Sequence, residues 1–253
     1  MTILDRFRLD GRTAIVTGAS SGLGVAFAQA LAEAGADVAL GARRAERLSS
    51  TQELVRSAGR RSIAVRTDVS VPEDCDRLVQ EAIDAFGKVD ILVNNAGVGT
   101  AYPAVRETPD KFRAVIDVNL NGCYWMAQAC GRVMPPGSSI INISSVLGFT
   151  TLGLPQAAYS ASQAGLIGLT RDLAQQWTSR KGIRVNALVP GLFASEMSDQ
   201  YPAGYIESQM PRILAGRVGE AGELAAAVVF LASDASGYVT GTSLAVDGGL
   251  LTT

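Results

Sequence analysis

The sequence predicts an α/β fold, a single doubly wound Rossmann domain over residues 1–253 with a seven-stranded parallel sheet. Short apolar runs alternate with helix-length segments, which is typical of parallel sheets whose strands are joined by helices. A glycine-rich turn also lies between the first run and the first helical segment, as in nucleotide-binding folds. A chain of 253 residues is long enough to bury about three quarters of its unfolded surface in one core.

Seven strands are expected from the apolar runs. Two of the runs, Ile91-Leu92-Val93 and Ile140-Ile141-Asn142-Ile143, do not alternate between apolar and polar residues, which indicates strands covered by helices on both faces. The expected strands are residues 13–17, 38–41, 63–66, 91–94, 139–143, 184–189 and 243–246.

Helical segments are expected between most of these strands. Residues 23–34, 45–58 and 72–86 carry apolar side chains at helical spacing, mostly with a glycine near the C-terminal end. Two longer segments, 108–133 and 156–179, are rich in small and apolar residues. The only irregular region in this interpretation is 191–216, rich in Met, Tyr, Pro and Gly, which we expect to form a lid.

Composition limits the chemistry of the protein. The chain has no histidine, which excludes Ser-His-Asp and Cys-His catalysis and most transition-metal sites. Its three cysteines lack metal-ligand spacing, so we expect reduced thiols and no metal. A net charge of −2 gives little support for nucleic-acid binding. With neither a signal-peptide pattern nor a long apolar run, we expect a cytoplasmic protein that binds a small molecule and no membrane.

The turn after the first strand is the predicted nucleotide site. Glycines at this point let the chain turn tightly and let a pyrophosphate approach the backbone, and the N-terminus of the following helix favours an anion. A turn of this kind also occurs without a ligand, but its place between strand and helix favours a cofactor site. The expected contacts are Gly18, Ser20, Ser21, Gly22, Leu23 and Gly24.

The end of the second strand favours NADP(H) over NAD(H), which stays the alternative cofactor. NAD sites usually place a carboxylate here to bind the ribose hydroxyls, but this chain has Ala42 followed by Arg43 and Arg44. The Arg43 guanidinium is suited to a 2′-phosphate. Either arginine could instead be a solvated start to the second helix, more readily Arg44.

Together these features resemble the short-chain dehydrogenase/reductase family over residues 11–249. Its TGxxxGxG loop matches residues 17–24, and its C-terminal turn matches residues 241–249. Three further motifs match Asn94-Asn95-Ala96-Gly97, Ile143-Ser144-Ser145 and Pro190-Gly191.

The resemblance implies further cofactor contacts. Asp68 and Val69 would border the adenine, and Ser195 would bind the nicotinamide carboxamide. From the residues alone, Asp68 and Ser195 could instead cap local structure, and the asparagine motif could be a simple turn. The remaining implied contacts are Asn95, Ala96, Gly97, Tyr159, Gln163, Pro190 and Gly191.

The resemblance also implies the catalytic residues. Tyr159 would exchange a proton with the substrate oxygen, Ser145 rather than Ser144 would hold that oxygen, and Asn119 would organise a water relay. Ser145 and Tyr159 are one residue further apart than is usual in the family, so we expect the loop 149–155 to bulge toward the substrate.

The fourth catalytic position departs from the family pattern. It lies four residues after the tyrosine, on the same helical face, and holds Gln163 where the family has lysine. An amide can bind the nicotinamide ribose, but it has no charge with which to lower the tyrosine pKa from about 10. The chain's only lysines, Lys88, Lys111 and Lys181, are not close to Tyr159 in sequence.

Three explanations of Gln163 stay open at this point: an engineered substitution, a natural enzyme with an altered proton path, or a protein that has lost catalysis. The first function hypothesis is therefore an NADP(H)-dependent oxidoreductase interconverting a carbonyl, of the ketone or 3-oxoacyl type, and a secondary alcohol. The second is a noncatalytic NADP(H)-binding sensor or scaffold.

The expected substrate pocket is largely apolar and suits a medium-sized ketone or acyl carbonyl. It would be lined by Val98, Phe149, Leu152, Leu154, Met197, Tyr201 and Tyr205, although such a cluster could also be lid packing. In the family, helices matching residues 108–133 and 156–179 pair between subunits, which implies a homotetramer, and small residues such as Gly165 and Gly168 suit close helix packing.

Overall fold

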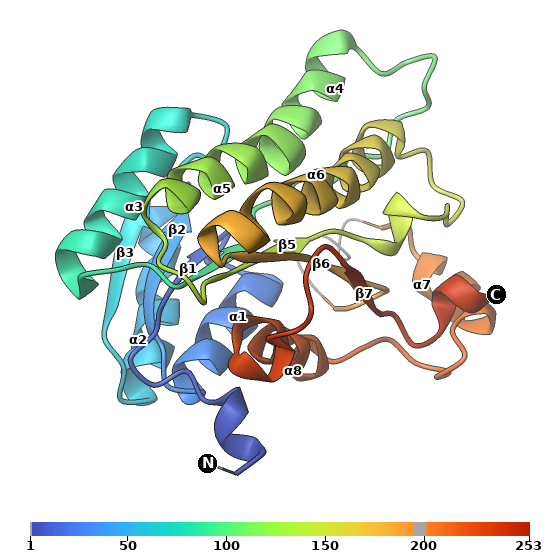
Figure 1. Ribbon diagram of the computed structural model, residues 1–253. Helices are drawn as coiled ribbons and strands as arrows, with labels where there is room; N and C mark the ends of the chain where they lie inside the picture. Colours follow the sequence, from blue (N-terminus) through green and yellow to red (C-terminus); the bar gives the residue numbers. More distant parts are fainter. Residues whose placement is uncertain (1, 195–200) are drawn as a thin grey trace.

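The computed structural model describes residues 2–194 and 201–253 and shows one sheet of seven parallel strands between two layers of helices (Figure 1). The strands lie where the apolar runs predicted them, to within one residue at each end. They are β1 (Thr13–Thr17), β2 (Asp37–Ala42), β3 (Ser62–Arg66), β4 (Ile91–Asn94), β5 (Ser139–Ile143), β6 (Arg184–Pro190) and β7 (Ser243–Val246).

The strand order is β3-β2-β1-β4-β5-β6-β7, which confirms the doubly wound Rossmann-type prediction. The chain builds the sheet outward from β1 to β3 and then returns to place β4 on the other side of β1, in parallel register with Val16 beside Val93. Ligands of such sheets bind at the carboxyl ends of the strands where the order reverses.

Three helices cover one face of the sheet. They are α1 (Gly22–Glu33), α2 (Leu48–Ser57) and α8 (Ala221–Ala232). Phe27 and Leu31 of α1 are fully buried and share a core cluster with α2, α8 and the strands. This burial fixes the N-terminus of α1 beneath the glycine-rich turn.

The opposite face carries α3 (Pro72–Phe86), α4 (Pro109–Ile116), α5 (Gly122–Val133) and α6 (Ala157–Lys181). Between α4 and α5 the chain forms a π-helical turn, η3 (Asp117–Asn121). Leu78 of α3, Met126 of α5 and Leu173 of α6 are buried in the second core cluster. Apolar packing on both faces explains the uninterrupted apolar runs of the central strands.

The chain also contains short helical turns and one short helix. Residues 205–209, in the expected lid, form the helix α7 (Tyr205–Gln209). The short turns are η1 (Leu4–Phe7), η2 (Ala45–Arg47), η4 (Val146–Gly148), η6 (Met210–Arg212), η7 (Asp234–Ser236) and η8 (Leu250–Thr252).

The structure corrects two details of the sequence interpretation. The second helical segment begins with the 3-10 turn η2 before α2 starts at Leu48. Residues 191–216 are also not the only irregular region, because 95–108 contain neither helix nor strand. That segment follows the carboxyl end of β4. It therefore begins at the edge of the sheet where ligands of such folds bind. No helix in the described residues is long and apolar enough to cross a membrane.

Candidate active site

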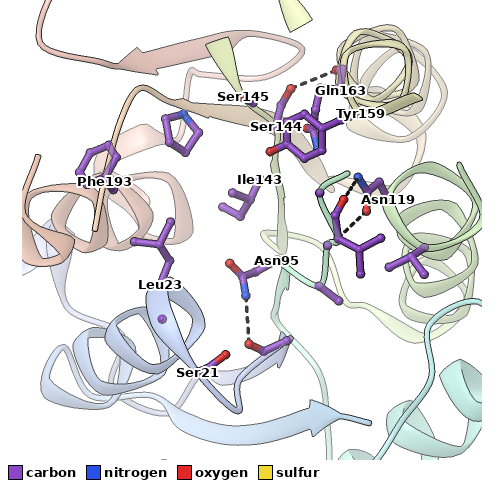
Figure 2. A pocket seen from close by; sticks show the side chains of 18 of the residues that line it. Ser21, Leu23, Asn95, Asn119, Ile143, Ser144, Ser145, Tyr159, Gln163 and Phe193 are labelled. Atoms are coloured by element: carbon purple, nitrogen blue, oxygen red, sulfur yellow. Dashed lines mark hydrogen bonds between the residues drawn. The ribbon is translucent and has the colours of Figure 1, made fainter. Parts of the chain in front are cut away.

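A cavity of about 620 Å³ opens at the carboxyl ends of the central strands. Its lining runs from the glycine-rich turn after β1 to the N-terminal half of α6 (Figure 2). Most residues expected from the sequence line it: Gly18, Ser20, Ser21, Gly22, Leu23, Arg43, Asp68, Val69, Asn95, Ala96, Gly97, Asn119, Ser145, Tyr159, Gln163, Pro190 and Gly191.

Two expected residues do not line the described cavity. Gly24 lies behind the turn, where a Cβ atom would come within 2.7 Å of the Asn95 amide nitrogen, so this glycine allows close packing of α1. Ser195 lies outside the described residues, as does Met197 of the expected pocket.

The glycine-rich turn has the shape of an anion-binding site. Gly18 and Gly22 have φ angles of 67° and 56°, which a residue with a side chain adopts only under strain. Ser21 precedes α1 without a side-chain cap on the helix, so the first backbone amides of α1 are left for another acceptor. These amides and the helix dipole favour a bound phosphate.

The asparagine motif after β4 supports this turn. The Asn95 side-chain amide donates to the carbonyls of Thr17 and Gly18, at 2.9 and 3.3 Å. In return, the Thr17 hydroxyl accepts hydrogen bonds from the backbone amides of Asn95 and Ala96. The motif is therefore more than a turn after β4, because it fixes the position of the glycine-rich loop.

The end of β2 brings two arginines to the same end of the cavity. Arg43 and Arg44 are exposed and line it, next to the buried Ala42. Arg44 donates to the hydroxyl of Ser21 at 2.9 Å and to that of Ser20 at 3.4 Å. The sequence favours Arg43 over Arg44 as a cofactor contact. The structure adds that Arg44 is bonded to the glycine-rich turn through the serine hydroxyls, which are distant from it in sequence.

Asp68 and Val69 lie at the cavity edge after β3. The Asp68 carboxylate accepts hydrogen bonds from the backbone amide and the hydroxyl of Ser70, at 3.1 and 2.7 Å. It therefore organises its own turn, whereas α3 itself begins after Val71. Its backbone amide donates to Asp74, and these contacts hold the segment against the cavity.

The other end of the cavity joins the end of β5 to α6. Tyr159 and Gln163 lie one helical turn apart on α6 and both are buried. The Ser145 hydroxyl acts on Tyr159 in the direction that lowers its pKa and accepts a hydrogen bond from the Leu147 amide at 3.2 Å. The Ser144 hydroxyl instead donates to the backbone carbonyl of Gln163 at 3.0 Å and so braces the strand against the helix (Figure 2).

Burial shapes the acid–base chemistry of Tyr159. Loss of solvent is the main cause that raises its pKa to about 12, Tyr201 contributes in the same direction, and the Ser145 hydrogen bond acts against them. At neutral pH the phenol is therefore protonated, which suits a proton donor.

Gln163 has an unsatisfied polar atom. Its side-chain oxygen is buried and has no hydrogen-bond partner. Burying such a group without a partner costs free energy, so the position favours a ligand that donates a hydrogen bond. The amide adds no charge beside Tyr159.

All three lysines lie away from this cavity. The Lys88 ammonium binds Asp90, that of Lys111 lies 3.8 Å from the centre of the Tyr102 ring, and that of Lys181 donates to the Gly131 carbonyl. None lines the cavity, so no lysine from elsewhere in the chain takes the place of the family's lysine in the described site.

Asn119 lies in the π turn η3 and is buried. Its side chain makes two hydrogen bonds with Val98, accepting from the amide at 2.8 Å and donating to the carbonyl at 2.9 Å. It also donates to the Ser162 hydroxyl. Asn119 thus joins the irregular segment after β4 to α6, and π turns are frequent at functional sites.

The apolar part of the cavity matches the expected pocket in part. Val98, Leu152 and Tyr201 line it, and Tyr205 packs against Tyr201. Leu152 comes from the loop 149–155, whereas Phe149 is 56% exposed and neither Phe149 nor Leu154 lines the cavity. The loop therefore contributes its leucine, but not its phenylalanine, to the cavity.

Sequence reasoning missed several other lining residues. They lie at or after the carboxyl ends of β3, β4, β5 and β6 or in η3, and the strand ends were the signal that could have found most of them. They are Thr67, Gly99, Val118, Ile143, Val146, Leu147, Leu192 and Phe193. In the described part of the chain no group of His, Cys, Asp and Glu side chains could hold a metal ion.

Comparison with known proteins gives consistent matches. The family model described as enoyl-(acyl carrier protein) reductase matches residues 18–251. The 2-dehydro-3-deoxy-D-gluconate 5-dehydrogenase of Dickeya dadantii is 39% identical, covering 98% of this chain and 99% of its own.

Two solved structures extend the comparison. A gluconate 5-dehydrogenase from Burkholderia cenocepacia, in complex with NADP and tartrate, superposes with a TM-score of 0.92 at 36% identity over 100% of both chains. A short-chain type dehydrogenase/reductase from Mycobacterium marinum has a TM-score of 0.94 at 32% identity, covering 98% of this chain and 99% of that one. The chain therefore belongs to the short-chain dehydrogenase/reductase family of oxidoreductases, which act on CH–OH groups.

Proposed function

We propose that this protein is an NADP(H)-dependent oxidoreductase that interconverts a carbonyl, of the ketone or 3-oxoacyl type, and a secondary alcohol. The observation that carries the proposal is that Ser145, Tyr159 and Gln163 face one cavity together with the glycine-rich turn. A proton donor and an anion-binding turn at opposite ends of the same cavity suit a dinucleotide and a small carbonyl compound.

The described residues fit this cofactor. The uncapped start of α1 would hold the pyrophosphate, and Arg43, assisted by Arg44, would bind the 2′-phosphate. The unpaired oxygen of Gln163 would accept a hydrogen bond from a ribose hydroxyl. The solved structure with bound NADP and the absence of a carboxylate at Ala42 support NADP(H), and NAD(H) is the alternative cofactor.

The remaining cofactor contacts keep the roles implied by the family. Asp68 and Val69 would border the adenine, and Asn95, Ala96 and Gly97 would line the middle of the dinucleotide. Pro190 and Gly191 would lie beside the nicotinamide, and Ser195 would bind its carboxamide.

When bound, the nicotinamide supplies or accepts the hydride. Tyr159 donates its hydroxyl proton to the carbonyl oxygen during reduction, and Ser145 holds the same oxygen by a hydrogen bond. Gln163 binds and orients the ribose without adding charge. Asn119 is a positioning residue here, because its side chain is committed to Val98 and Ser162.

Gln163 favours reduction over oxidation. Oxidation needs a phenolate to accept the alcohol proton, and the phenolate of Tyr159 is disfavoured by burial. Each unit by which the pKa exceeds the working pH costs about 1.4 kcal/mol in forming the phenolate. Reduction starts from the protonated phenol and avoids this cost.

We further propose that the protein works as a cytoplasmic homotetramer built from one domain per chain, with residues 191–216 acting as a lid over the substrate. Small residues on α6 support the assembly: Gly168 has open space around its Cβ position among the described residues. Solution scattering is expected to give about four times the mass of one 26.4 kDa chain; a monomer would contradict this assembly.

The function is tested by measuring NADPH binding and then assaying a panel of carbonyl compounds with the unsubstituted chain and with Gln163→Lys. Turnover by the unsubstituted chain supports the proposal. Turnover only after Gln163→Lys would indicate a disabled enzyme. Tight NADPH binding with no turnover in either form would instead favour the noncatalytic sensor or scaffold, which the uncharged Gln163 makes the second candidate.

A further inference from the structure

The substrate end of the cavity differs chemically from its cofactor end. The charged lining side chains, Arg43, Arg44 and Asp68, all lie near the glycine-rich turn or the neighbouring strand ends. Around Tyr159 the described lining is apolar or carries only hydroxyl and amide groups. The apolar part consists of Val98, Val146, Leu147, Leu152, Leu192 and Tyr201.

This apolar wall is held rigidly by contacts among its own parts. Leu152 is 3% exposed, and its backbone carbonyl accepts a hydrogen bond from the Tyr205 hydroxyl at 2.9 Å. The Tyr205 ring lies 4.9 Å from the Tyr201 ring in an edge-to-face arrangement. Because Tyr205 uses its hydroxyl on Leu152, it presents no free donor to a substrate.

No cation is available to a substrate anion from this wall. Arg212 lies near it, but the guanidinium donates to the Thr151 carbonyl at 3.0 Å and does not line the cavity. An ionised carboxylate in such surroundings would lose its hydration without gaining a partner.

We infer that the substrate is an uncharged ketone with apolar substituents, and that a ketone carrying a carboxylate is excluded by the wall around Leu152. This inference rests on the proposed function and narrows it. It separates the protein from relatives whose names point to acidic ligands, such as the 2-dehydro-3-deoxy-D-gluconate dehydrogenase and the gluconate dehydrogenase crystallised with tartrate.

The experiment compares 4-oxopentanoate, its amide and its methyl ester on the NADP⁺ complex. The amide has the same number of heavy atoms as the acid, so it isolates the effect of charge. Dissociation constants come from ligand-observed NMR titration, which needs no turnover, and kcat/KM is measured with NADPH. We expect the ester to bind most tightly and the acid at least about 100-fold more weakly.

A paired substitution tests the role of the wall. Leu152→Arg adds a cation, whereas Leu152→Met adds a similar stem without charge. We expect Leu152→Arg, but not Leu152→Met, to improve the affinity of the acid relative to the ester by at least about tenfold. NADPH binding by each variant shows that it has folded.

Two results would overturn the inference. One is binding of the acid to the unsubstituted chain within tenfold of the affinity of the ester, a difference of at most about 1.4 kcal/mol. The other is a selective loss of acid binding in Arg212→Gln, which would show that this arginine serves a substrate carboxylate. Failure of the proposed function is distinct, because it would abolish turnover of all three compounds while the order of their affinities could still be measured.

Discussion

The two ends of the cavity rest on different kinds of interaction. At the cofactor end, backbone amides, glycine conformations and the arginines after β2 make the site. At the catalytic end the chemistry depends on a few side chains, Ser145, Tyr159 and Gln163. The first end keeps the family pattern in full, and the second departs from it at one residue that lacks the family's positive charge.

From this difference we expect cofactor binding and catalysis to vary separately in this chain. A backbone site depends on local conformation, which Gln163 does not affect. The proton chemistry depends on the ionisation of one phenol, whose pKa is raised to about 12 mainly by burial.

Removal of the Tyr159 hydroxyl is expected to have the largest effect. Tyr159→Phe should lower kcat for carbonyl reduction by about a thousandfold, because a positioned proton donor contributes on the order of 10²–10⁴ in rate. NADPH affinity should change little. Tyr124→Phe, a tyrosine outside the cavity lining, serves as the control, and a comparable loss there would contradict the role given to Tyr159.

A charge at position 163 should act through the ionisation of Tyr159. Gln163→Lys is expected to raise the rate of alcohol oxidation at neutral pH by about 10- to 100-fold, since a nearby cation lowers a phenol pKa by roughly 1–2 units. Gln163→Met removes the amide without adding charge and should show no gain; equal gains in both variants would mean that charge is not the cause.

At the cofactor end, Arg43→Ala should reduce NADPH affinity by about tenfold or more, because a hydrogen bond to a charged group contributes roughly 1.5–3 kcal/mol. NADH affinity should stay nearly unchanged, as NADH has no 2′-phosphate. Fluorescence titration with both cofactors measures the effect. Arg56→Ala, on the exposed side of α2, is the control, and parallel losses for NADPH and NADH would remove the basis for assigning Arg43 to the phosphate.

The smallest effect is expected outside the cavity lining, at Gly168 on α6. Gly168→Ala should raise the free energy of unfolding by about 0.5–1 kcal/mol, since alanine favours a helix interior over glycine and the added methyl group meets no described atom within 4 Å. Denaturant unfolding measures this gain.

If the proposed tetramer packs closely at this residue, Gly168→Leu should separate the subunits in size-exclusion chromatography while Gly168→Ala should not.

The sequence predicted the sheet accurately, because buried parallel strands leave uninterrupted apolar runs such as Ile91-Leu92-Val93. It also predicted most of the cavity lining, since lining residues follow strand ends. It did not predict the π turn at Asn119 or the packing role of Gly24. Both depend on contacts between segments distant in sequence, with Val98 in one case and Asn95 in the other.

The catalytic end shows the same limit more sharply. Sequence alone located Gln163 and its missing charge, but not the unpaired side-chain oxygen or the distance of every lysine from the cavity. The preference of Arg44 for Ser20 and Ser21 was likewise hidden, because those hydroxyls lie more than twenty residues away along the chain.

The pH dependence of the two reaction directions tests the central claim, that Tyr159 works as a neutral proton donor beside an uncharged Gln163. We predict that kcat/KM for NADPH-dependent reduction is flat between about pH 6 and pH 9, whereas that for alcohol oxidation rises about tenfold per pH unit over the same range. The rise follows from a phenol with a pKa near 12. Oxidation that levels off near neutral pH, with reduction falling as the pH rises above that point, would contradict the claim.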